Sequence, residues 1–149
     1  ISSRSLWFGR CPVERTAVAG AGEELPKLRM IATPNVEFVV APGDEELRDL
    51  YAGRRRCFFP ESRIGGIPVE AQAADCPVIA FRAGDTPERV VENHTALFFD
   101  EQSEISSLGA VEEFRAAVFS PEEQKKNAAR FSREQFRQEI GHIIAEYGR

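Results

Sequence analysis

The chain has 149 residues, of which 42% are hydrophobic and 29% are charged, and its formal net charge is −5. This length supports one domain with a substantial hydrophobic core, and the composition excludes a disordered chain. The acidic balance argues against a general nucleic-acid or anionic-membrane binder, because such proteins need a basic surface. It stays compatible with one anionic small ligand held by local groups. No apolar run approaches the roughly 20 residues of a membrane-spanning helix.

The N-terminus and the cysteines bear on processing and on cellular location. No signal-peptide pattern opens the chain, and its first residue is Ile1, which favours a fragment or a cleaved product. Its three cysteines, Cys11, Cys57 and Cys76, lack the spacing of a metal site. Cys57 and Cys76 lie in or beside apolar strands, so buried thiols are favoured over a disulfide or a metal. We therefore expect a reducing cytoplasmic location, either free or peripheral to the inner face of the membrane in the full-length protein.

The N-terminal region, residues 1–15, is the least defined. Residues 2–6 favour a strand, and Thr16–Ala19 favour a second strand that enters the glycine turn Gly20-Ala21-Gly22. Only residues 7–15 lie between the two, whereas a parallel crossover usually needs about a dozen residues or more. Either these strands are not joined by a crossover, or a helix has been lost from this region.

Short apolar strands then alternate with helices as far as residue 99. We predict helices over 23–30, 44–51, 67–74 and from 86 onward, and strands over 35–40, 54–60, 77–81 and 95–99. Asp44 and Thr86 are the predicted N-caps of two of these helices. Strands of this kind are typical of a parallel sheet covered on both faces. The predicted fold class is therefore α/β, a Rossmann-like doubly wound parallel sheet with helices on both faces, as a single domain over 1–149.

The C-terminal third, residues 103–149, is predicted to be helical. One apolar stripe steps by three and four residues and consists of Ile105, Leu108, Val111, Phe114 and Val118. Ser120–Glu123 and Ser132–Gln135 have the pattern of capping boxes. The last helix carries a second stripe, which is either core or a surface that docks on another lobe. Its members are Phe136, Ile140, Ile143, Ile144 and Tyr147.

Glycine turns are the strongest indication of a binding site. Doubly wound domains bind ligands at the carboxyl ends of their strands, where loops 20–22, 42–43, 62–66 and 83–85 are predicted to converge. Glycine lets the backbone approach a ligand closely. A helix that starts at such a turn presents unbonded N–H groups and its positive end, which suits a phosphate. The alternative is that Gly65-Gly66 is a plain turn.

Several segments occur together in order: AGAGEEL at 19–25, IPVEAQA at 67–73, CPVIA at 76–80, Gly84 with Glu88, and TALFF at 95–99. In this order and spacing they resemble the family-four retaining glycosyltransferases of the GT-B fold, and the mannosyltransferase-like branch in particular. The resemblance covers roughly residues 16–145. It implies the C-terminal, nucleotide-sugar-binding half of a two-lobed enzyme whose acceptor-binding N-terminal lobe is not in this chain. It also implies a reaction that needs no metal or other cofactor.

The resemblance further implies roles for individual residues. Glu70 is expected to bind the ribose hydroxyls of the donor, since a carboxylate can accept hydrogen bonds from both hydroxyls of a cis-diol. The backbone N–H groups of Gly65, Gly66 and Ile67 match the turn that cradles the diphosphate. The other donor-binding candidates are Gly20, Gly22, Ser62, Gly84 and Glu88. For Glu70 and Glu88, the alternative is an ordinary role at a helix start or on the surface.

The chain departs from the family pattern at several positions. Ser62 stands where the family has a glutamate, so its neighbour Glu61 becomes the candidate sugar-contacting acid, with a solvated loop residue as the alternative. Arg4 and Arg10 are the candidates for the basic side chains that brace the diphosphate. Glycines of the family are replaced by Asp75, Asp85 and Ala96. Aspartate tolerates left-handed backbone, but Asp85 places a negative charge near the phosphate edge.

The predicted function is therefore that of a donor-binding lobe. The whole protein would transfer a hexose, with mannose as the first candidate, from a GDP- or UDP-linked sugar to a saccharide or lipid acceptor. The isolated lobe is expected to be inactive in transfer. The alternative is a degenerate, non-catalytic module that binds a nucleotide sugar weakly or serves as a pairing surface in a dimer. The absence of Gly-x-Gly-x-x-Gly after the first strand counts against a dinucleotide enzyme.

Overall fold

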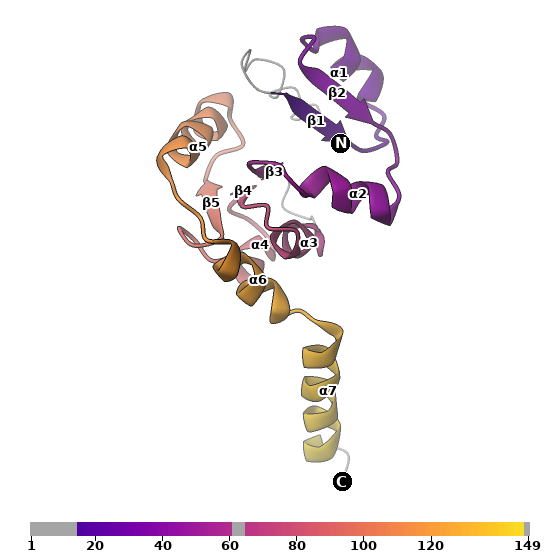
Figure 1. Ribbon diagram of the computed structural model, residues 1–149, viewed down its shortest axis with the longest axis vertical. Helices are drawn as coiled ribbons and strands as arrows, with labels where there is room; N and C mark the ends of the chain where they lie inside the picture. The colour runs from indigo at the N-terminus through magenta and orange to yellow at the C-terminus, as the bar shows by residue number, and fades with distance from the viewer. Residues whose placement is uncertain (1–14, 61–64, 148–149) are drawn as a thin grey trace.

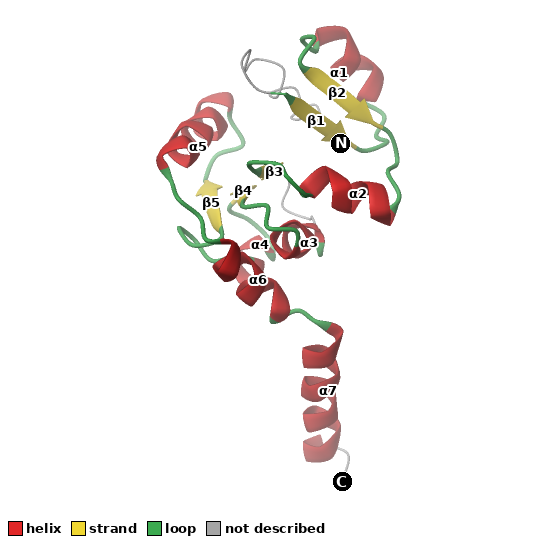
Figure 2. Cartoon of the chain, viewed as in Figure 1, coloured by secondary structure: helices red, strands yellow, loops and turns green. Residues whose placement is uncertain are grey.

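The computed structural model describes residues 15–60 and 65–147, and strands alternate with helices through most of them (Figures 1 and 2). The first elements are β1 (Thr16–Ala19), α1 (Leu25–Ile31), β2 (Val36–Val39) and α2 (Asp44–Tyr51). The next are β3 (Cys57–Phe59), α3 (Ile67–Ala73), β4 (Val78–Phe81), α4 (Thr86–Arg89) and β5 (Ala96–Phe99). Helices α5 (Glu104–Ala116), α6 (Pro121–Ala129) and α7 (Arg133–Tyr147) follow. This order confirms the predicted α/β class.

The strands are all parallel but fall into two sheets among the described residues. β1 pairs with β2, with Thr16 opposite Val36. β3, β4 and β5 form the second sheet in that order, so that Val78 of β4 lies between Cys57 and Ala96. The β1–β2 pair and α1 lie together at the top of Figure 1, apart from the three-stranded sheet. The doubly wound architecture is thus split between β2 and β3.

Alternating side chains of β4 fill two apolar cores, one on each face of the three-stranded sheet. Val78 and Ala80 pack on one face with Ala71 of α3. Ile79 packs on the other face with Phe114 of α5. The two-sided burial agrees with the short apolar strands of the sequence. Helix α3 therefore packs directly on the three-stranded sheet, whose strands β3 and β4 precede and follow it in sequence.

A cluster of buried side-chain amides also holds α3 in place. Gln72 Nε2 donates to the carbonyl of Pro68 at 2.8 Å and to that of Arg89 at 3.2 Å. Asn127 Nδ2, from α6, donates to Gln72 Oε1 at 2.7 Å and to the same Arg89 carbonyl at 2.8 Å. The cluster joins α3, the end of α4 and α6, and it gives α3 a defined position relative to all three.

Helix α5 buries only part of the predicted stripe, including Phe114. Ile105 is 86% exposed, and Val118, which is 92% exposed, lies beyond the end of the helix. The residues that are buried are Ser107, Ala110 and Phe114. Ser107 is tolerated there because its hydroxyl donates to a backbone carbonyl one turn earlier, at 2.9 Å. The helix was predicted correctly, whereas its apolar stripe was only partly its packing face.

Two predicted N-caps are wrong by one residue. Asp44 and Thr86 are the first helical residues of α2 and α4, and Gly43 and Asp85 occupy the cap positions. Asp44 therefore acts from within the first turn, where a carboxylate stabilises the positive end of the helix. Thr86 is fully buried and packs in the interior of the domain.

The two predicted capping boxes behave differently. At the start of α7, the Ser132 hydroxyl accepts the N–H of Gln135 at 3.2 Å, which is the first bond of the predicted box, whereas the Gln135 side chain bonds Glu139. Ser120 is the N-cap of α6 but makes no side-chain capping bond, so that half of the prediction is wrong. Glu123 of the same pattern lies instead beside His94, with 3.1 Å between Oε1 and Nδ1.

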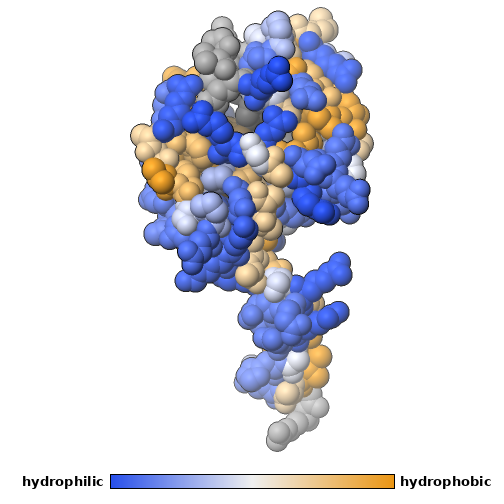
Figure 3. Space-filling model, in the orientation of Figure 1, coloured by the Kyte–Doolittle hydropathy of each residue, from blue (hydrophilic) through white to orange (hydrophobic). Residues whose placement is uncertain are grey.

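Helix α7 extends away from the rest of the described chain (Figure 1) and has no buried residue. Phe136 and Ile144 of its apolar stripe are each 64% exposed. Figure 3 shows apolar side chains along one side of this helix, opposite a hydrophilic side. The stripe is therefore not core within this chain, and the lobe-docking interpretation stays a prediction.

Candidate donor-binding site

The predicted phosphate turn lies between β3 and α3. Gly65 has φ = +55°, a left-handed conformation that glycine adopts without a steric penalty. Gly66 is the N-cap residue of α3, and Ile67 and Pro68 are its first two residues. The N–H of Ile67 has no acceptor within the helix, and Pro68 has no N–H. Both glycines are exposed, so a ligand can approach this end of α3.

Glu70 lies in the first turn of α3 and is exposed. Its Oε1 lies 3.7 Å from the position that a Cβ on Gly66 would occupy. The carboxylate is therefore folded back over the glycine turn. Four of the predicted donor-binding residues, Gly65, Gly66, Ile67 and Glu70, thus lie together at the N-terminal end of α3.

Tyr51, at the end of α2, is a neighbour of Glu70 that the sequence did not mark as part of the site. It is buried and packs with Ala71 of α3. Burial raises the pKa of Tyr51 well above its ordinary value, and the negative charge of Glu70 raises it further. Tyr51 is accordingly a neutral phenol at physiological pH. The sequence signal for its burial is the apolar face that it forms with Leu47 and Leu50 of the same helix.

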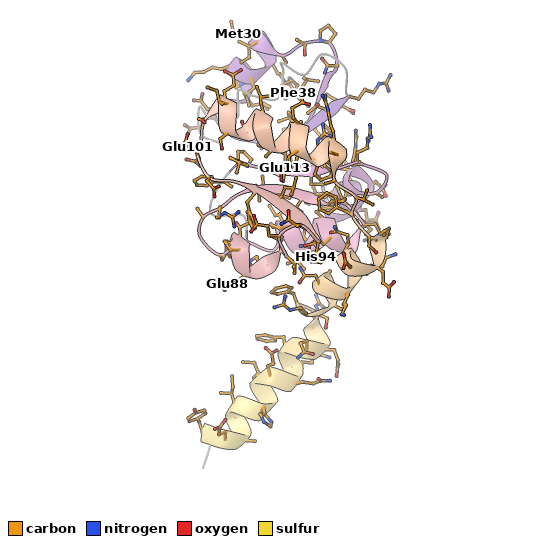
Figure 4. All side chains as sticks on the ribbon, turned by 90° about the vertical axis from the view of Figure 1, so that its left-hand side faces the viewer. Met30, Phe38, Glu88, His94, Glu101 and Glu113 are labelled. Atoms are coloured by element: carbon orange, nitrogen blue, oxygen red, sulfur yellow. The ribbon has the colours of Figure 1, made fainter. Side chains whose placement is uncertain are left out.

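Gly84 and Glu88 lie after β4, the strand next to β3. Gly84 has φ = +63° and directly precedes Asp85. Arg89 Nε and Nη2 both lie 2.8 Å from Asp85 Oδ2. The negative charge that Asp85 brings to this edge is therefore offset by a neighbouring cation. Glu88 is exposed and projects from α4 (Figure 4).

Gly20 and Gly22 belong to the other sheet. Gly20 has φ = +149°, and its N–H donates to the carbonyl of Val39 at 3.0 Å. The carbonyl of Gly22 accepts the N–H of Leu25 at 3.1 Å, at the start of α1. Both glycines form the predicted turn after β1. Their part in a site shared with Gly65 stays a prediction.

Asp75, where the family resemblance leads us to expect a glycine, has a left-handed backbone conformation. Its φ is +60°, in the left-handed region that the sequence predicted for this position. Its Oδ2 lies 2.9 Å from Nζ of Lys125 on α6. The chain thus turns sharply from α3 into β4 here, and the charge is paired with a lysine.

Arg82 is a basic residue at the carboxyl end of β4 that sequence reasoning missed. Its Nε donates to Asp100 Oδ1 at 2.7 Å, and its Nη1 donates to Glu92 Oε2 at 3.0 Å. The guanidinium also stacks over the Phe98 ring, 4.4 Å from its centroid. The hydrogen bonds to Glu92 and Asp100 raise the pKa of Arg82, with the largest effect from Glu92. Arg82 is therefore engaged by carboxylates at the edge where an anionic ligand is expected.

Four predicted site residues, Arg4, Arg10, Glu61 and Ser62, lie outside the described residues. Within 15–60 and 65–147, no three His, Cys, Asp or Glu side chains gather in a group that could hold a metal ion. Over the same ranges, no helix is both long and apolar enough to span a bilayer.

We compared the sequence and the structure with those of known proteins. Residues 10–114 match the family model described as glycosyl transferases group 1, and the search of curated proteins gave no match. The structure is similar to sucrose-phosphate synthase from Thermosynechococcus elongatus, with a TM-score of 0.76 at 20% identity. The match covers 96% of this chain and 41% of that one, so this chain spans less than half the length of the solved relative. Its fold is that of the Rossmann-like C-terminal lobe of a GT-B protein, and by its sequence the chain belongs to the glycosyl transferases group 1 family.

Proposed function

We propose that this chain is the donor-binding part of a retaining glycosyltransferase. The complete protein transfers a hexose from a nucleotide diphosphate sugar to a saccharide or lipid acceptor. One observation carries the proposal: the Glu70 carboxylate lies over the Gly65-Gly66 turn, in a chain of the glycosyl transferases group 1 family. A carboxylate that can accept a diol, next to a turn that a phosphate can approach, supports a donor site at this end of α3.

Each group in the site has a defined part in the proposal. The two oxygens of Glu70 accept the ribose hydroxyls of the donor. The N–H groups of Gly65, Gly66 and Ile67 donate to the diphosphate, and the positive end of α3 stabilises the charge that develops on the leaving diphosphate. Gly84 and Glu88 extend the site to the end of β4. The Asp85–Arg89 ion pair supports this placement, because it offsets the one carboxylate that would oppose a diphosphate there.

We propose a nucleotide diphosphate hexose as the donor and a saccharide or lipid as the acceptor. GDP-mannose is the first donor to test and UDP-glucose the second, because the resemblance of residues 67–99 favours the mannosyltransferase-like branch. Transfer takes place between two lobes and without a metal. The acceptor-binding lobe lies outside this chain, so we expect the 149-residue chain to bind a donor without transferring the sugar. Measurable sugar transfer by the isolated chain would overturn this division of labour.

Calorimetric titration of the chain with GDP-mannose and then UDP-glucose tests the proposal. Glu70→Ala should weaken binding of the preferred donor by about 10-fold or more, since a hydrogen bond to a charged group contributes about 1.5–3 kcal/mol. Glu122→Ala is the matched control, because Glu122 is an exposed acid in the first turn of α6. Binding that both variants weaken equally would contradict a specific role for Glu70.

A second function is favoured by one sequence observation. Ser62 stands where the family has a sugar-contacting glutamate, which is a change expected in a non-catalytic module. Such a module binds a nucleotide sugar weakly or serves as a pairing surface. A folded chain that binds neither donor, together with a full-length protein that also binds neither, would support this second function.

A further inference from the structure

Two cysteine sulfurs lie in contact at the start of β3 and just before β4. Cys57 is the first residue of β3, and Cys76 lies between α3 and β4. Their Sγ atoms are 2.7 Å apart, and both thiols are free. A disulfide bond has a length of about 2.05 Å. The two sulfurs are therefore already within a fraction of an ångström of bonding distance.

The backbone holds both cysteines in this position. The N–H of Cys57 donates to the Pro77 carbonyl at 2.8 Å, which anchors the start of β3 beside the start of β4. The N–H of Cys76 donates to the Ala71 carbonyl at 2.9 Å, which anchors it to α3. The left-handed turn at Asp75 directs the chain between these two anchors. The backbone thus holds the two sulfurs in contact before any bond forms.

The two thiols differ in access. Cys76 is fully buried, whereas Cys57 is half-buried. The hydrogen bond to Cys76, and then burial, raise the pKa of Cys57 well above its ordinary value, while Arg54 lowers it slightly. Because the thiolate is the reactive form, the pair exchanges slowly, and Cys57 is the sulfur that an oxidant reaches first.

We propose that Cys57 and Cys76 are a reversible thiol–disulfide modification site, oxidised by a small-molecule disulfide such as oxidised glutathione. The Cys57 thiolate attacks one sulfur of oxidised glutathione, breaks its S–S bond and releases one glutathione. The Cys76 thiolate then attacks Sγ of Cys57 in the mixed disulfide and releases the second glutathione. Two protein thiols are oxidised, one glutathione disulfide is reduced, and the two protein protons pass to the two glutathione thiols.

The covalent ring that this bond closes contains the predicted phosphate turn and Glu70. It links the start of β3 to the end of α3, 19 positions apart in sequence. Closing a ring of about this size shifts the folding equilibrium on the order of 100-fold toward the native state. The redox state of the pair therefore changes the stability of the folded chain, whether or not the chain binds a donor.

The test uses the full chain with Cys11→Ser, which leaves only the two cysteines of interest. The folded protein is incubated with oxidised glutathione, denatured in the presence of an alkylating agent and mapped by mass spectrometry. We expect a Cys57–Cys76 cross-linked peptide that dithiothreitol abolishes. We also expect an oxidised chain that is on the order of 100-fold more stable in urea than the reduced chain. Cys76→Ser should instead stop at the mixed disulfide on Cys57.

Two results would overturn the proposal. One is a chain that stays folded during prolonged incubation with the oxidant and in which both cysteines are fully alkylated after it is denatured. The other is oxidation that gives only glutathione adducts or cross-links between chains. Because the peptide map is made on a chain that retains Cys57 and Cys76, neither result depends on how well the serine variant at position 76 folds.

Discussion

Replacing Asn127 with alanine removes the donor that joins α6 to the helix carrying Glu70. Asn127 Nδ2 donates to Gln72 Oε1 at 2.7 Å and to the Arg89 carbonyl at 2.8 Å. Gln72 is 0% exposed and Asn127 is 4% exposed, so bulk water does not reach these groups. In the variant, Gln72 Oε1 loses this donor, whereas the Arg89 carbonyl keeps the 3.2 Å bond from Gln72 Nε2.

The magnitude follows from these two bonds, because the third, which the exposed Arg130 Nη1 donates to Asn127 Oδ1 at 2.8 Å, is replaced by water in the variant. A buried acceptor left without a donor costs about 1–3 kcal/mol, and the second bond, whose acceptor keeps a partner, adds about 1 kcal/mol. We therefore expect Asn127→Ala to lower the free energy of unfolding by about 2–4 kcal/mol. Urea denaturation followed by far-UV circular dichroism measures this as a lower midpoint at an unchanged slope.

Two further variants sharpen the test of the buried cluster. Gln135→Ala is the matched control, because Gln135 is an exposed amide on α7 whose 3.1 Å bond to Glu139 lies in solvent, and it should change stability by less than about 0.5 kcal/mol. Replacing Gln72 and Asn127 together with leucine removes both partners, and should cost less than the sum of the single changes. An Asn127→Ala variant as stable as the Gln135→Ala control would refute the reasoning.

Three other predictions concern single features. Asp75→Ala should be less stable than Asp75→Gly by about 1 kcal/mol, because φ at this position is +60°; equal thermal midpoints would show that the backbone relaxes. Arg82 lowers the pKa of Glu92 from its ordinary 4.5. The stability from this pair is therefore fully present above pH 4.5 and is lost as the pH falls through the lowered value. Arg82→Gln should accordingly be less stable than the wild type at pH 7 and should approach it at pH 3 in urea titrations. Ile144→Ser should alter the free energy of unfolding by less than about 0.5 kcal/mol, because Ile144 is 64% exposed. A larger loss would mean that α7 packs on this chain.

Elements with strong local signals were predicted closely. The predicted helix 67–74 and strand 77–81 differ by one residue at one end from α3 and β4. Gly66 followed by Pro68 marks the start of α3, because proline is favoured in the first turn of a helix and glycine just before it. The apolar run after Cys76 then has the length and composition of a buried strand. The glycine turn and Glu70 are close in sequence and lie at the start of the same helix, and their role as a binding site stays a prediction.

Features set by distant neighbours were not predictable in this way. The buried face of α5 depends on the space beside Ile79 and Phe99, where the small residues Ser107 and Ala110 fit against the sheet. Gln72 and Asn127 are 55 positions apart, and both look like polar surface residues in a local window. The division into two sheets likewise depends on strand pairing, which the periodicity of each strand does not encode.

Binding of GDP or UDP and its 2′,3′-dideoxy analogue to the wild type and to Glu70→Ala tests the central claim most directly. We expect the wild type to bind the better of the two nucleotides about 10-fold or more tightly than its dideoxy analogue, since hydrogen bonds to a carboxylate contribute about 1.5–3 kcal/mol. Glu70→Ala should bind the two forms with similar affinity, because its ribose acceptor is gone. A dideoxy penalty of the same size in both proteins would contradict the assignment of Glu70 as the ribose-binding residue of a donor site.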